Sequence, residues 1–191
     1  MNNRTRHMAM ASIFSALSIV LKILSVNLTT IRLLNFSPIT LILAGYFLGP
    51  YYGLLIGFLT DTAYSLTLPA NWVMFSQPKT IAGIIFTAIT TLWNLFTVST
   101  MLWGLCGGLI KKFNFRRPLL GLLIVVPLIA IIETTINTLQ MILWNYEMGV
   151  ILTKLPERIL NMILRIPIFV VTCNELIYRL EKTNLIESYY L

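Results

Sequence analysis

The chain has 191 residues, of which 57% are hydrophobic and 11% are charged, and its formal net charge is +7. A soluble domain of this size has too little interior to hide that much apolar surface, so the composition excludes a soluble protein and indicates an integral membrane protein. The two cysteines, Cys106 and Cys173, lie inside expected helices and imply neither a disulfide framework nor a metal site.

The first expected membrane span covers residues 8–28, since a spanning helix needs about 20 mostly apolar residues. A charged start before an apolar run also occurs in signal peptides, but no clear small-residue cleavage site follows, so the segment is interpreted as a retained span. Lys22 lies near its outer end, where the long side chain is expected to reach the membrane surface. Ser12 and Ala16 form a strip of small side chains, which favours close packing of another helix.

Gly49 and Pro50 interrupt the next apolar segment. Proline has no amide donor and disfavours helix in the residue before it, so the pair predicts a break between spans at residues 38–48 and 51–68. Gly53 and Gly57 in the second of these spans are interpreted as packing residues within the chain.

Three further spans are expected at residues 79–110, 119–146 and 156–180. The predicted fold is therefore an all-α integral membrane protein, a single domain over residues 1–191 with six transmembrane helices.

Basic residues predict that the N-terminus is cytoplasmic. With six spans, eight lysines and arginines then fall on the inner side and four on the outer side, as the positive-inside rule requires. Five spans would put the N-terminus and the basic loop at residues 111–117 on opposite sides, which fits less well. The inner residues are Arg4, Arg6, Lys111, Lys112, Arg116, Arg117, Arg179 and Lys182, and the outer ones are Arg32, Lys79, Lys154 and Arg158.

A polar segment, residues 61–79, joins the third and fourth expected spans on the outer side. Its aromatic and charged side chains are either a lid or binding loop, or ordinary interfacial residues, since Trp and Tyr collect at membrane surfaces whatever the function. The candidates in it are Asp61, Tyr64, Trp72, Phe75 and Lys79. Trp103, by contrast, is interpreted as a lone interfacial aromatic with a much weaker claim to a binding role.

Polar side chains also follow helical spacing in the last two expected spans. Glu133, Asn137, Gln140 and Trp144 share one stripe, and Arg158, Asn161 and Arg165 share another. Counting about 1.5 Å of rise per residue puts Glu133 and Arg165 at comparable depth. They are either a buried ion pair that joins two helices or ligand contacts, because intramembrane charges do both.

Several catalytic motifs are absent from the sequence. It contains no Gly-x-x-x-x-Gly-Lys-Ser/Thr phosphate loop, so the chain does not bind ATP in that way, and no His-Glu-x-x-His or Gly-x-Ser-x-Gly motif. His7, the single histidine, is expected in a solvated basic tail without a catalytic role. A small lipid-acting membrane enzyme is the alternative from another class, with Asp61 and Glu133 as its candidate acid and base.

Four segments together resemble the substrate-binding subunits, or S components, of energy-coupling factor (ECF) vitamin transporters, and specifically their folate branch. The likeness begins with "SALSIVLKIL" in the first expected span, where Ser12 and Ala16 fall on the family's Ala-x-x-x-Ala motif. The segment "IRLLNFSPITLILAGYFLGPYYGLLIGFLTD" is similar to the branch's Arg-x-x-x-Phe-x-x-Pro sequence, Gly-Pro turn and later Asp. The segments "INTLQMIL" and "LPERILNMILRIPI" are similar to its Asn-Thr-Leu and Pro-x-Arg-x-x-x-Asn patterns.

The resemblance implies six helices that enclose a vitamin near the extracellular side of a bacterial cell membrane. It also implies partners, namely a transmembrane coupling subunit and two cytoplasmic ATPase subunits, which bind the ATP so that this chain needs no cofactor. Ser12 and Ala16 would contact the coupling subunit. Arg32, Phe36, Asn137, Arg158 and Asn161 would lie at or near the pocket.

One departure from the folate branch concerns the loop after the third span. This chain reads "LPANWVMFSQPKTIAG" where the branch has a Gly-rich aromatic loop, which leaves another vitamin or precursor as an alternative ligand. Folate is the leading ligand, bound without enzymatic turnover. The expected ligand contacts are Arg32, Phe36, Asp61, Tyr64, Trp72, Phe75, Lys79, Asn137, Gln140, Trp144, Arg158, Asn161 and Arg165.

Overall fold

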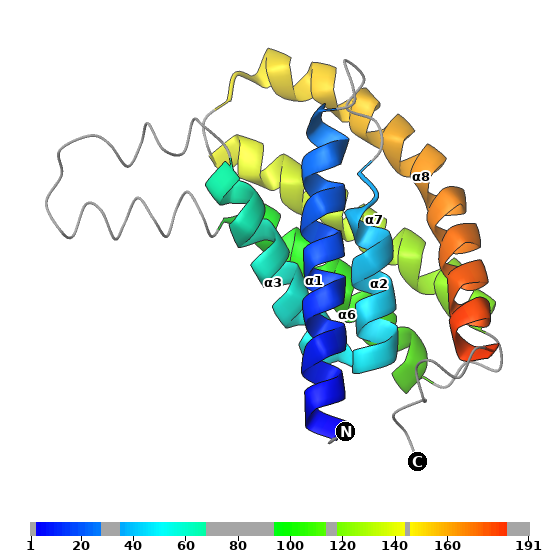
Figure 1. Cartoon of the computed structure of the whole chain (residues 1–191). Helices are drawn as coiled ribbons and strands as arrows, with labels where there is room; N and C mark the ends of the chain where they lie inside the picture. The colour runs from blue at the N-terminus through cyan, green and yellow to red at the C-terminus, as the bar shows by residue number, and fades with distance from the viewer. Residues whose placement is uncertain (1–2, 28–34, 68–93, 114–117, 144–145, 183–191) are drawn as a thin grey trace, which may run out of the picture.

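The computed structural model describes residues 3–27, 35–67, 94–113, 118–143 and 146–182, which are helical almost throughout and contain no strand (Figure 1). The part of the expected fourth span before residue 94 lies outside the described residues. The helices are α1 (Asn3–Asn27), α2 (Ser37–Leu48), α3 (Pro50–Thr67), α6 (Leu95–Lys112), α7 (Pro118–Leu143) and α8 (Met148–Lys182).

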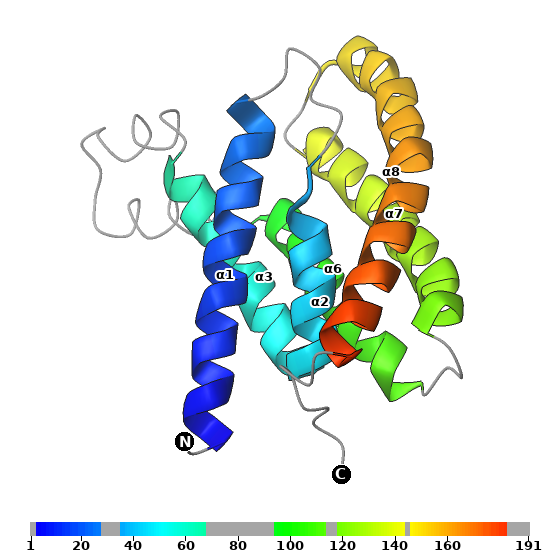
Figure 2. The same ribbon diagram turned by 45° about the vertical axis from the view of Figure 1, so that its right-hand side comes forward.

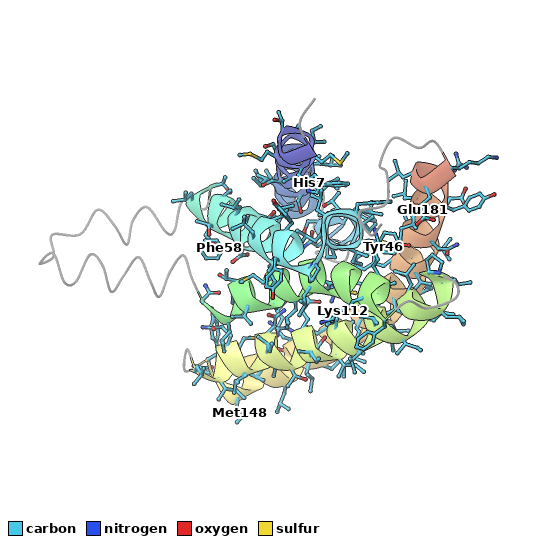
Figure 3. All side chains as sticks on the ribbon, turned by 90° about the horizontal axis from the view of Figure 1, so that it is seen from below. His7, Tyr46, Phe58, Lys112, Met148 and Glu181 are labelled. Carbon is cyan, nitrogen blue, oxygen red and sulfur yellow. The ribbon has the colours of Figure 1, made fainter. Side chains whose placement is uncertain are left out.

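The helices pack around α6. Seen from below, α1 and α7 lie on opposite sides of the molecule, with α2, α3 and α6 between them (Figure 3). All twelve residues of α2 are buried, so this short apolar helix is the core of one half of the bundle. By length and composition, α1, α7 and α8 contain segments that can cross a membrane, namely His7–Leu24, Pro118–Leu143 and Ile151–Lys182.

One end of the bundle, called the lower end here, gathers the start of α1, the α2–α3 turn, the end of α6, the start of α7 and the end of α8 (Figures 1 and 2). The Tyr46 hydroxyl donates to Glu181 at 2.9 Å, and the Lys111 ammonium lies 5.5 Å from the centre of the Tyr46 ring. His7 is buried against Tyr52, with ring centroids 6.1 Å apart. The expectation of a solvated His7 is therefore wrong, because α1 begins at Asn3 and carries His7 into the packed helix.

The Gly49-Pro50 pair separates α2 from α3, as its sequence predicts. Gly49 has φ 96°, a conformation that strains any residue with a side chain, and its N–H donates to the Gly45 carbonyl at 2.9 Å. Pro50 then starts α3, where its missing N–H costs nothing because the first amides of a helix have no partner within it. The turn is tight because a single residue lies between the two helices.

Prolines inside the later helices have a different effect. The last span is expected to start at Pro156, but α8 begins at Met148 and continues through both Pro156 and Pro167, and α7 continues through Pro127. Each interior proline removes one backbone hydrogen bond, and membrane helices tolerate this because neighbouring groups can satisfy the freed carbonyl. The proline therefore does not mark the start of this helix.

Glycines bring the backbones of α2, α3 and α6 into direct contact. A Cβ placed on Gly45 or Gly53 would overlap the Gly104 carbonyl, and one placed on Gly107 would overlap the Ile42 carbonyl. A Cβ on Gly57 would lie 2.8 Å from the Met101 Cα. The expected packing role of Gly53 and Gly57 within the chain fits these contacts, and the matching glycines of α6 complete it.

Candidate functional site

A first group of polar side chains joins α1, α3 and α6. This group is the Lys22 cluster, which consists of Lys22, Asp61, Tyr64, Thr97 and Thr100.

An ion pair of Lys22 with Asp61 forms the centre of this cluster. The Lys22 ammonium also donates to the Thr100 hydroxyl at 3.1 Å, and its nitrogen lies 5.2 Å from the centre of the Tyr64 ring. The Thr97 hydroxyl donates to the second oxygen of Asp61 at 2.6 Å. Both carboxylate oxygens of Asp61 therefore have partners within the chain.

The expectation that Lys22 reaches the membrane surface is wrong. Its exposed fraction is 8%, and its ammonium turns inward to Asp61. The reason is that an opposite charge lies at the same depth on a neighbouring helix. Pairing the two buried charges avoids leaving either one alone in an apolar interior.

A second polar group lies between α6, α7 and α8. It is the Arg165 cluster, which consists of Trp103, Glu133, Asn137, Asn161 and Arg165. Arg165 forms an ion pair with Glu133, so the two stripes expected from sequence meet at this pair. The Arg165 guanidinium also lies 5.5 Å from the Trp103 ring and 5.8 Å from the Phe169 ring, both measured to the ring centres.

The antiparallel course of α7 and α8 sets the positions of the two asparagines. Asn137 lies four residues after Glu133 and Asn161 four residues before Arg165, so both lie one turn above the ion pair, on opposite helices. The Thr134 hydroxyl, 3.8 Å from the Met162 sulfur, fits the same register. The amide oxygens of Asn137 and Asn161 are buried and have no hydrogen-bond partner among the residues that the structure describes.

Trp103 is not an interfacial residue. Its exposed fraction is 1%, and its ring meets Phe169 edge to face at 5.6 Å between centroids. The position follows from the glycines of α6, because Gly104 and Gly108 turn one face of that helix toward α2 and α3. A side chain on a neighbouring face, such as Trp103, is then directed toward α8.

Gln140 and Arg158 lie nearer the upper end of the same helices. Gln140 accepts a hydrogen bond from the Leu95 N–H at 3.0 Å, and so satisfies an amide that the start of α6 leaves without an intrahelical partner. Arg158 donates to the Thr138 hydroxyl at 3.4 Å and lies 3.1 Å from the Met141 sulfur. Both side chains connect helices in this structure.

An apolar groove of about 310 Å³ opens beside these residues, between α7 and the start of α8. Its threonine hydroxyls donate to carbonyls of their own helix. The lining residues are Thr134, Thr135, Thr138, Leu139, Ile142 and Leu155.

The remaining expected residues are distributed as follows. Phe36 directly precedes α2 and is 37% exposed. Ser12 and Ala16 lie on the uncovered outer face of α1, where the Ser12 hydroxyl donates to the Met8 carbonyl of its own helix at 2.9 Å. The described residues hold no group of three or more metal-ligating side chains. Arg32, Trp72, Phe75, Lys79 and Trp144 lie outside the described residues.

The sequence model of the ECF transporter substrate-specific component family matches residues 6–171 of the chain. The chain belongs to this family. No curated protein and no solved structure matches it significantly. An ECF substrate-specific component is a membrane transporter subunit and not an enzyme, and the family implies association with ECF coupling and ATPase subunits. The matched residues include both polar clusters, so both lie in the part of the chain that defines the family.

Sequence reasoning missed Trp103 as well as Thr97, Thr100 and the inward position of Lys22. One signal for Lys22 was available, since an intramembrane lysine needs a partner and Asp61 was the carboxylate left without one. For an ECF substrate-specific component the two clusters then differ in character. In the Lys22 cluster both carboxylate oxygens of Asp61 have partners within the chain. In the Arg165 cluster several buried polar atoms have no hydrogen-bond partner among the residues that the structure places.

Proposed function

We propose that the chain binds a vitamin for import by an ECF transporter, at the Arg165 cluster, with folate as the leading ligand. The observation that supports this site is a pair of buried amide oxygens, those of Asn137 and Asn161, one turn above a buried ion pair. Neither oxygen has a hydrogen-bond partner within the described helices. Buried polar atoms in native proteins are almost always hydrogen-bonded, so atoms left open in a subunit of this family favour a ligand there.

The ligand preference rests on chemistry and on the resemblance to the folate branch. Folate has a flat pterin ring and an acidic tail. Amides can bind the donors and acceptors of the ring, aromatic side chains can stack on it, and arginine or lysine can bind the tail carboxylates. Arg158 lies nearer the upper end than the asparagines, on the side where Lys79 and Arg32 are expected from sequence. We therefore propose that the pterin ring binds beside Asn137 and Asn161 and that the acidic tail of folate extends toward the upper end.

We propose that the lower end of the bundle lies in the cytoplasm and that six helices cross the membrane. Lys111 and Lys112 end α6, and Arg179 and Lys182 lie in the last turn of α8, all at the lower end. The positive-inside rule assigns such an end to the cytoplasm. The vitamin would then enter from the upper, external side of a bacterial membrane, and ATP would be bound by the partner subunits alone.

Folic acid is expected to bind the purified protein in lipid nanodiscs with a stoichiometry near one, measured by isothermal titration calorimetry. Replacing Asn161 with alanine removes one amide from the site and should weaken binding about tenfold or more. The matched control is Asn174→Ala, because Asn174 lies on the same helix about 20 Å closer to the lower end. This variant should bind like the wild type.

Absence of binding by both folic acid and a reduced folate would overturn the folate assignment. A thermal-shift panel of other vitamins and precursors then tests the alternative ligands, because a tight ligand raises the apparent stability by mass action. The changed loop at residues 68–83 is the reason to include them.

The outer face of α1 is proposed to dock on the coupling subunit. Ala16 is exposed there beside Ser12, and a bulky side chain would hold a partner helix away. Ala16→Trp should abolish vitamin uptake by the complete transporter in proteoliposomes while ligand binding stays unchanged. Ile124→Trp is the control, since Ile124 is also exposed but lies on α7, across the bundle. Normal uptake by the Ala16 variant would argue against docking at this strip.

A further inference from the structure

Two buried N–H donors beside the ion pair lack hydrogen-bond partners in the part of the chain that the structure describes. They are the indole Nε1–H of Trp103 and the guanidinium Nε–H of Arg165. The exposed fractions of these residues are 1% and 8%, so water outside the protein does not satisfy the two donors. Native structures rarely keep such donors open, and each one needs a cause.

The surrounding side chains hold both donors in place. Glu133 pairs with the Arg165 guanidinium through the terminal Nη2, and the neighbouring Nε–H donates to none of the described residues. Phe169 packs against the Trp103 ring edge to face, and the guanidinium lies over both rings. The donors are therefore preorganised, and a ligand group that meets them does not have to order them first.

These donors differ in kind from the asparagines nearby. An asparagine amide offers either an oxygen or an NH2 group and can adapt to the partner that it meets. An indole N–H and a guanidinium N–H can only donate. At a ligand site, the asparagines adapt to the group that binds, whereas the N–H groups of Trp103 and Arg165 can pair only with an acceptor atom.

We propose that Trp103 is a specificity-determining residue, whose indole N–H, together with the Nε–H of Arg165, binds a carbonyl oxygen on the ring of the ligand. The selected class is a heterocycle that carries an oxo group, as opposed to one that carries an amino group in the same place. An amino group would present hydrogens to two donors and leave both unpaired, which a desolvated site disfavours. This proposal rests on the proposed function, because the same cluster is the vitamin site.

The direct test compares folic acid, whose ring has a 4-oxo group, with its 4-amino analogue. We expect the wild type in nanodiscs to bind folic acid at least about tenfold more tightly than the analogue. Trp103→Phe keeps an aromatic ring against Phe169 and removes the N–H. In this variant the Kd for folic acid should rise about tenfold while the Kd for the 4-amino analogue changes little, so the preference is lost. An unchanged ratio of the two Kd values would overturn the proposal.

A second measurement observes the wild type, in which the packing around Trp103 is unchanged. The chain has four tryptophans, and 15N labelling of their indoles gives one N–H signal for each, with that of Trp103 identified by its absence from the Trp103→Phe spectrum. Saturating folic acid should move the Trp103 proton signal of the wild type downfield, as a new hydrogen bond requires, and the 4-amino analogue should not. If bound folic acid leaves this signal in place, Trp103 does not contact the ligand.

The outcomes separate this proposal from the folate assignment. If folic acid does not bind but another oxo-heterocycle from the vitamin panel does, folate is wrong, and the two measurements are repeated with that compound. A weaker Kd in Trp103→Phe and a shifted indole signal then support the role of Trp103, whereas no change in either overturns it. If no compound of the panel binds or moves the Trp103 signal, only water bonds to the two donors. This result would overturn both the proposed function and the role of Trp103.

Discussion

Replacing Lys22 with methionine is expected to destabilise the protein by about 3–5 kcal/mol. Methionine keeps an unbranched side chain only one atom shorter and removes the ammonium, so Asp61 stays buried without its cation. An uncompensated charge in an apolar interior costs far more than the lost attraction alone. Unfolding by SDS in mixed micelles, followed by circular dichroism, measures the difference.

The double variant, Lys22→Met with Asp61→Asn, should recover most of this loss. It removes both charges, and the amide oxygen of the new asparagine can still accept from the Thr97 hydroxyl, which donates to Asp61 at 2.6 Å in the wild type. Replacing a whole buried ion pair with neutral side chains of similar size is often close to neutral for stability. Recovery would show that the lone carboxylate, and not the altered packing, causes the loss in the single variant.

A matched surface pair provides the control. Arg179 and Glu175 pair at 2.7 Å on α8, four residues apart, with exposed fractions of 73% and 54% for their side chains. Exposed pairs of this kind contribute only about 0.3–0.5 kcal/mol, so Arg179→Met should have a small effect. Equal effects of Lys22→Met and Arg179→Met would mean that water reaches the Lys22 cluster in the membrane.

Local sequence signals predict much of the fold, but they do not predict which side chains pair across it. The Gly49-Pro50 break depends on two residues whose backbone limits apply in any context. The meeting of Glu133 with Arg165 also follows from sequence, since two consecutive helices joined by a short connection have a fixed register. Lys22 and Asp61 are 39 residues apart, on helices that are not consecutive, so their meeting depends on the arrangement of the whole bundle.

Trp103 shows the same limit within the candidate site. For an isolated aromatic residue in an apolar helix, the sequence does not show which neighbouring helix the side chain faces. That direction is set by the neighbouring glycines, which determine the face of α6 that meets α2 and α3. Gly104, Gly107 and Gly108 are visible in the sequence, but their effect on Trp103 becomes evident only once their partners, Gly53 and Ile42 among them, are known.

The contact of Gly104 with α3 is expected to tolerate no side chain. A Cβ on Gly104 would overlap the Gly53 carbonyl, which is backbone and cannot turn aside as a side chain can. Gly104→Ala therefore forces two helices apart, and we expect a loss of about 3 kcal/mol in the same SDS unfolding assay, at the upper end of the usual cost of overpacking. The matched control is Gly149→Ala, because no atom lies within 4 Å of a Cβ at Gly149 and alanine favours helix by about 1 kcal/mol over glycine.

Gly104→Ala also tests whether α6, which contributes residues to both polar clusters, holds the two clusters in place. Thr97 and Thr100 on this helix contact Asp61, and Trp103 contacts the Arg165 cluster. Displacing α6 from α3 should therefore weaken vitamin binding in proportion to the loss of stability, although Gly104 itself is directed away from the proposed site. Full stability in Gly104→Ala would mean that the backbones of α3 and α6 lie farther apart in the membrane. Lost stability with unchanged ligand affinity would mean that the Arg165 cluster is held by α7 and α8 alone.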